Sequence, residues 1–136
     1  MKELWTKDEA EFHGRFFDFP AVKCSPKPVQ QPHPPVLLGG YAANVFKRVV
    51  AWGDGWMPVR VTEEQVRAGR ATMDELAEAA GRDPSTIQLI VTNVQPDREV
   101  IAGYEEAGAN RVTVALPPEA GADGLAKLER LAEQVL

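Results

Sequence analysis

Two consecutive glycines, Gly39 and Gly40, are the residues of this chain best suited to binding an anion. An apolar run at 36–38 leads directly into them, and apolar residues at helical spacing follow from Ala42 without a spacer. A buried strand that turns on Gly-Gly into a helix leaves backbone N–H groups facing outward, where the helix dipole favours negative charge. This pattern is typical of a phosphate site, and also of a tight turn that binds nothing.

Other side chains offer less chemistry. His13 lies among aromatic residues, so a packing or turn contact is a simpler role for it than catalysis. Cys24 is the single cysteine and has no base near it in the sequence. Because no His, Cys or carboxylate residues stand at metal-ligand spacing, the sequence predicts no metal site, and it identifies no catalytic residue.

Composition limits the classes of function. The 136 residues, 44% of them hydrophobic and 26% charged, fit one ordinary globular domain. A net charge of −5 without a basic stripe argues against binding nucleic acid. No apolar run is long enough to span a membrane. With a single cysteine and the charged start Met1-Lys2-Glu3, the expected location is cytoplasmic.

The elements that would position the glycine turn alternate along residues 36–136. Strand patterns begin near 36, 55, 87 and 111, each is followed by a helical pattern, and Thr62 to Gln65 form a capping box. This order predicts an α/β fold with a parallel sheet, (βα)4, in either an open doubly wound sheet or part of a (βα)8 barrel. Residues 1–35 are expected to be a separate excursion, a hairpin with arms near 11–13 and 16–19 followed by a proline-rich connector.

Five segments together resemble a known family. They are Leu4-Trp5-Thr6, the run FHGRFFDF at 12–19, PKPVQ at 26–30, PVLLGG at 35–40 and GDGWMP at 53–58. In this order they are similar to the C-terminal half of the luciferase-like monooxygenase superfamily. The nearest branch is the actinobacterial oxidoreductases that use the deazaflavin coenzyme F-420, and the resemblance covers essentially the whole chain.

The resemblance implies a TIM barrel whose fifth to eighth strands are the four predicted here. It also implies an oxidoreductase that binds F-420 or FMN, together with a small-molecule substrate, across the carboxyl ends of the strands. The cofactor phosphate would be held at Gly39, Gly40, Tyr41, Ala42 and Ala43. Trp56 and Met57 would line the barrel interior. Arg60 would lie at its mouth and face an anionic cofactor tail, although an ordinary surface arginine is the alternative.

The first four strands of that barrel are absent from this chain. The chain is therefore expected to be a truncated product, a fragment, or a half barrel that assembles with a second copy or with a separate N-terminal half. Exposed sheet edges near Val36 and Val112 would favour such an assembly. A non-catalytic subunit or remnant, and an open doubly wound domain that binds a phosphorylated small molecule, remain alternatives to an active enzyme.

Overall fold

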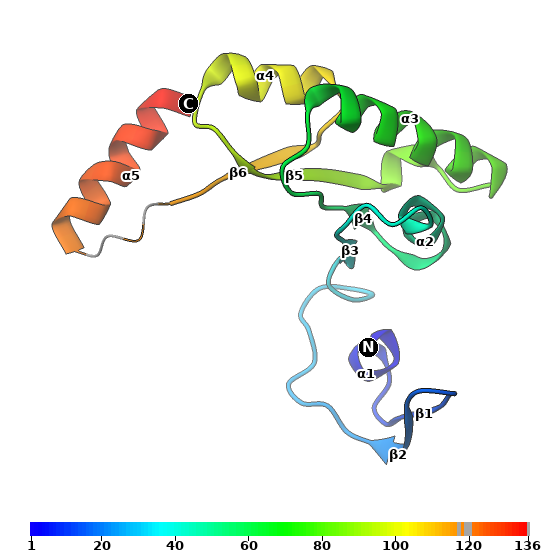
Figure 1. Cartoon of the computed structure of the whole chain (residues 1–136). Coiled ribbons are helices and arrows are strands. Elements are labelled where there is room, and N and C mark those ends of the chain that lie inside the picture. The colour runs from blue at the N-terminus through cyan, green and yellow to red at the C-terminus, as the bar shows by residue number, and fades with distance from the viewer. Residues whose placement is uncertain (117, 119–120, 136) are drawn as a thin grey trace. The chain divides into compact units, whose positions relative to one another are not determined.

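The computed structural model describes residues 1–116, 118 and 121–135, and the chain divides into two compact units, Met1–Pro35 and Val36–Leu136 (Figure 1). The first unit contains the short helix α1 (Lys2–Thr6) and an antiparallel hairpin of β1 (Ala10–His13) and β2 (Asp18–Val22). Nδ1 of His13 lies 2.6 Å from Oδ1 of Asp18 across this hairpin, so His13 makes a turn contact, as predicted. The helix α1 was not predicted.

The second unit alternates strands and helices around a parallel sheet. The strand order is β3-β4-β5-β6, so β3 and β6 are the two edges. The elements, in chain order, are β3 (Leu37–Leu38), α2 (Val45–Trp52), β4 (Gly55–Trp56), α3 (Glu63–Ala79), the 3-10 turn η1 (Pro84–Thr86), β5 (Gln88–Val94), α4 (Arg98–Glu106), β6 (Arg111–Val114) and α5 (Gly121–Val135). The predicted (βα)4 order is confirmed.

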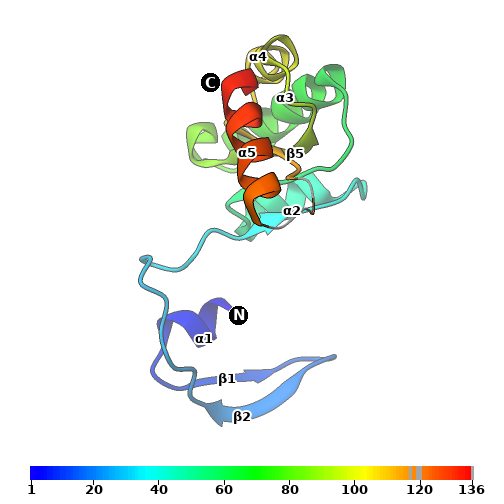
Figure 2. The same ribbon diagram turned by 90° about the vertical axis from the view of Figure 1, so that its left-hand side faces the viewer.

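The core of this unit lies between the sheet and its helices. Its most deeply buried side chains come from α2, α3 and β5. They include Val49, Val66, Met73, Leu89 and Val91. Figure 1 shows α3 and α4 lying along the same side of β5 and β6, and Figure 2 again shows α3 next to α4. Burial of these aliphatic side chains therefore joins the helices to one face of the sheet.

Helix α3 begins as the sequence predicts. The backbone N–H of Thr62 donates to Oε1 of Gln65 at 2.9 Å, and the N–H of Gln65 donates to Oγ1 of Thr62 at 3.2 Å. This reciprocal capping box satisfies two amides that the first turn of a helix leaves without partners.

Helix α2 begins later than predicted. The expectation that a helix follows Gly39-Gly40 without a spacer is wrong, because a turn comes first and α2 starts at Val45. Gly40 has a left-handed backbone with φ of +87° at the beginning of this turn, and the N–H of Val45 then donates to the carbonyl of Ala42 at 2.8 Å. The helical spacing of apolar residues from Ala42 onward therefore includes a turn that is not itself helical.

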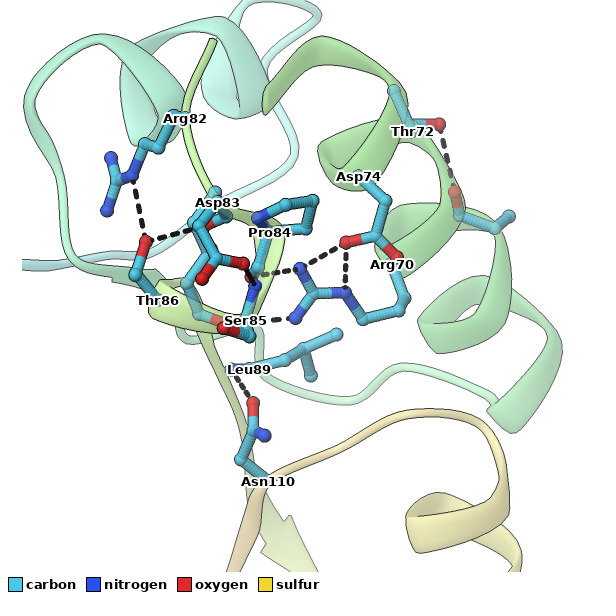
Figure 3. A network of polar contacts seen from close by, with 12 residues as sticks. Arg70, Thr72, Asp74, Arg82, Asp83, Pro84, Ser85, Thr86, Leu89 and Asn110 are labelled. Carbon is cyan, nitrogen blue, oxygen red and sulfur yellow. Dashed lines mark hydrogen bonds and ion pairs between the residues drawn. The ribbon is translucent and has the colours of Figure 1, made fainter. Parts of the chain in front are cut away.

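A polar network holds the opposite end of the sheet, where β5 begins (Figure 3). Arg70 of α3 donates to Oδ1 of Asp74 at 2.9 Å and to the carbonyl of Ile87 at 2.9 Å. The backbone N–H of Ser85 holds the pKa of Asp83 below its usual value. In parallel α/β folds this end of the strands usually contributes to stability rather than to ligand binding.

Within the described residues, no helix combines the length and the apolar character that crossing a membrane would require.

Candidate functional site

The glycine turn lies at the carboxyl end of β3, where ligands of parallel α/β sheets usually bind. Residues 39–44 are all exposed, whereas Leu38 before them and Val45 after them are buried. The turn is therefore a solvent-facing loop fixed at both ends in the core of the second unit.

The two glycines have different structural requirements. Gly40 has a left-handed backbone with φ of +87°, and an added Cβ would meet no atom within 4 Å. At Gly39 a Cβ would lie 3.6 Å from the carbonyl oxygen of Met57, which is an ordinary contact. Glycine is thus required at position 40 by the backbone conformation, and space does not require it at either position.

Backbone donors in the turn are available to a ligand. In the part of the chain that the structure describes, the N–H groups of residues 41–44 donate no hydrogen bond to another group. Asn44 occupies the N-cap position of α2, yet its side chain makes no capping hydrogen bond. Unsatisfied N–H groups at the start of a helix, exposed and near its positive end, are what an anion site needs.

Two aromatic side chains hold this turn in place through hydrogen bonds to backbone carbonyls. Nε1 of Trp56 donates to the carbonyl of Gly40 at 3.0 Å, and the hydroxyl of Tyr41 donates to the carbonyl of Val59. Trp56 is 2% exposed, and its ring packs edge-on against Phe46 of α2 with centroids 4.8 Å apart. The prediction that Trp56 lines the barrel interior is wrong, because its side chain lies on the helix side of the sheet.

Arg60 lies beyond the carboxyl end of β4, exposed and close in sequence to the turn's anchor at Val59. Its φ of 57° is left-handed, as is the φ of 61° at Asn93 near the end of β5. The pairing register of β5 and β6 also shifts beside Asn93. Left-handed non-glycine residues and sheet irregularities cluster at functional sites, and no sequence pattern indicates the left-handed Arg60 or the register shift here.

A shallow hollow of about 260 Å³ opens beside the turn, between α2 and α3. Mostly small and aromatic side chains form its walls, from Tyr41, Ala42, Ala43, Val45, Phe46, Trp56, Gln65, Ala68, Gly69 and Thr72. The structure thus brings Tyr41, Ala42 and Ala43 together at one surface, with Arg60 next to the residue that anchors Tyr41.

The remaining candidates lie elsewhere. His13 belongs to the first unit, where Asp18 and Glu11 accompany it on the hairpin. Cys24 is a half-buried free thiol of the same unit. No group of three His, Cys, Asp or Glu side chains among the described residues is arranged to hold a metal.

The sequence model of the family described as luciferase-like monooxygenase matches residues 1–102, which is most of the chain. The chain belongs to the luciferase-like monooxygenase family.

Sequence relatives match this luciferase-like chain over all or part of its length. An uncharacterised protein of Mycobacterium tuberculosis is 32% identical over 136 residues, which cover 99% of this chain and 47% of the relative. The FMNH(2)-dependent dimethylsulfone monooxygenase of Pseudomonas putida is 33% identical over 78 residues, 52% of this chain and 22% of the enzyme. The chain therefore spans about half the length, or less, of the curated relatives it matches.

A comparison with solved structures likewise shows that this chain matches about half of a longer fold. An F420-dependent secondary alcohol dehydrogenase, solved with an F420-acetone adduct, superposes with a TM-score of 0.71 at 17% sequence identity. The match covers 99% of this chain and 58% of the dehydrogenase. The luciferase-like chain is thus a (βα)4 half of a TIM barrel, as the sequence predicts.

Proposed function

We propose that this chain is the C-terminal part of a flavin- or deazaflavin-dependent oxidoreductase of the monooxygenase type, and that it holds the cofactor phosphate at residues 39–43. The observation that carries the proposal is the set of exposed, unused N–H groups at 41–44, at the carboxyl end of a parallel strand. The names of two similar proteins, one FMNH(2)-dependent and one F420-dependent, support the choice of cofactor.

The turn suits a phosphate chemically. Peptide N–H groups are donors that carry no charge of their own, so they stabilise an anion without a competing counter-ion. Gly40 allows the left-handed backbone that the turn adopts. Arg60 adds a positive charge beyond the neighbouring strand for an anionic cofactor tail. When bound, a flavin or deazaflavin supplies the hydride transfer or oxygen activation, and this chain binds and orients it.

A second half barrel is the partner that the sheet favours. Strands β3 and β6 are edges, and Leu125 and Leu128 of α5 are 64% and 45% exposed. Open strand edges and exposed leucines are surfaces that proteins normally cover. We propose that a second copy or an N-terminal half covers them. A non-catalytic subunit that binds the cofactor would fit the same surfaces.

Paired titrations test the proposed site. FMN and riboflavin share one ring system and differ by the phosphate, so the ratio of their affinities measures the phosphate contribution. We expect FMN to bind about tenfold or more tightly than riboflavin, as hydrogen bonds to a charged group usually allow. F420 is tested the same way against its phosphate-free chromophore. Equal affinity for both members of each pair would contradict the proposal, and no binding at all would indicate an inert remnant.

A further inference from the structure

We propose that Trp56 is a positioning residue for the cofactor phosphate, because it fixes the direction of the Tyr41 N–H through the carbonyl of Gly40. The inference rests on the proposed function and adds a side chain that never touches the ligand. Its basis is the 3.0 Å hydrogen bond from Nε1 of Trp56 to the Gly40 carbonyl oxygen.

The indole of Trp56 is held rigidly enough to impose a direction. It is 2% exposed and packs nearly perpendicular to Phe46, with an interplanar angle of 84°. Gly69 of α3 provides a notch for both rings, since a Cβ there would lie 2.5 Å from Cζ3 of the indole and 3.2 Å from Cζ of Phe46. Contacts with α2 and α3 therefore restrict the ring, and its Nε1–H points toward the turn.

Peptide geometry transmits this direction to the ligand side. The peptide between Gly40 and Tyr41 is trans, so its C=O and N–H point in opposite directions within one plane. Because the buried indole draws the Gly40 carbonyl inward, the N–H of Tyr41 faces away from the core. The exposure of Tyr41 and the absence of a described acceptor for its N–H agree with this orientation.

The opposite orientation of this peptide would replace the partial positive charge that faces the ligand by a partial negative charge. Gly40 tolerates a wide range of backbone angles, so the plane could rotate if nothing held it. A rotated peptide would present the carbonyl oxygen, which repels a phosphate. The Trp56 hydrogen bond, with the Tyr41 hydroxyl bound to the carbonyl of Val59, selects the donor orientation.

The substitution Trp56→Phe tests the inference, because phenylalanine keeps an aromatic ring but lacks the N–H donor. We expect the affinity for FMN to fall about tenfold and the affinity for riboflavin to stay within about twofold of the original. Trp52→Phe is the matched control, since Trp52 is 43% exposed and lies at the last position of α2, at the end away from the turn. It should change neither affinity.

The two affinities distinguish the role of Trp56 from the existence of the phosphate site. Equal losses for FMN and riboflavin in Trp56→Phe, or no loss, would overturn the role of Trp56 while the phosphate site stands. A wild-type protein without preference for FMN would overturn the proposed function and, with it, this inference.

A measurement on the wild-type protein covers a variant that fails to fold. In nitrogen-15 NMR spectra, FMN should shift the Tyr41 amide and the Trp56 indole N–H together, and riboflavin should shift neither by this route. A Tyr41 amide that stays unmoved while FMN binds would overturn the inference.

Discussion

Gly40 and Arg60 share a left-handed backbone at the same end of the sheet, and they do so at different energetic cost. Glycine adopts this conformation freely, whereas a residue with a Cβ loses about 1 kcal/mol or more in it. The turn at Gly40 is thus built without strain, while Arg60 is held in a strained conformation at an exposed position. Strain kept at a strand end is consistent with a functional constraint on Arg60.

Replacing Gly40 by alanine should cost about 1 kcal/mol in the free energy of unfolding, because the added Cβ meets no atom but the backbone is strained. FMN affinity should also fall several-fold, because the strained backbone would move the N–H donors of the turn. Gly81→Ala is the matched control, since Gly81 has φ of +69° and equally open surroundings. It should lose similar stability in urea unfolding and leave FMN binding intact. If both variants bind FMN like the wild type, the turn is not the phosphate site.

Replacing Arg60 by glycine should raise stability and lower affinity together. Relief of the left-handed strain should add up to about 1 kcal/mol to the free energy of unfolding. If Arg60 faces the anionic tail of F420, the same change should weaken F420 binding several-fold, with a smaller effect on FMN. Asn93→Gly provides a comparison, because asparagine tolerates φ of 61° better and should gain less stability. Unchanged F420 affinity in Arg60→Gly would remove Arg60 from the site.

At the scale of elements, α2 has its two ends in different environments. Its beginning leaves N–H groups at the turn unused. At its end, Nη1 of Arg82 donates to the carbonyls of Val49, Val50 and Gly53 at 3.0, 3.0 and 2.8 Å. One guanidinium thus satisfies carbonyls that a helix end normally leaves without partners. The helix is anchored where it ends and open to a ligand where it begins.

Replacing Arg82 by methionine should therefore destabilise the protein by about 1–3 kcal/mol, the usual cost of leaving polar groups half-buried and unsatisfied. The free energy of unfolding of Arg82→Lys should lie between those of the wild type and the methionine variant, because lysine keeps the charge but not the planar donor group. Chemical unfolding measures both. The ratio of FMN to riboflavin affinity should stay constant, and a change in that ratio at unaltered stability would contradict the division between the two ends of α2.

The sequence predicted most elements, because their signals are local. The Thr62 capping box is encoded within four residues, and the strand at β5 stands out as an apolar run. The start of α2 was missed because the apolar spacing continues through residues 42–44, where the chain forms a turn. The orientation of Trp56 was missed as well. Strand β4 has only two residues, so alternation could not tell its two faces apart, and the notch at Gly69 is formed by a distant helix.

At the scale of the whole molecule, the second unit has surfaces that a closed barrel would cover. The sheet has edges at β3 and β6, and no described residue of α5 is buried although the helix is amphipathic. A TIM barrel closes with eight strands, so four leave both edges without partners. The open edges and the unburied face of α5 together favour association, and neither is evident from the sequence of one element alone.

Sedimentation velocity should show species larger than the 14.9 kDa monomer, increasing with concentration. The substitution Leu128→Glu should shift the distribution toward the monomer, because it places a charge among the exposed leucines of α5. Glu129→Gln, at an exposed neighbouring position, should not. A wild-type chain that stays monomeric at all concentrations, with no partner added, would contradict the assembly.

Amide hydrogen exchange most directly tests whether backbone donors of the glycine turn hold the cofactor phosphate. With FMN bound, the N–H groups of residues 41–44 should exchange at least about tenfold more slowly than in the free protein, because a hydrogen-bonded amide exchanges only when it opens. Riboflavin at equal occupancy should leave them unprotected. FMN that binds without protecting these four amides would contradict the account.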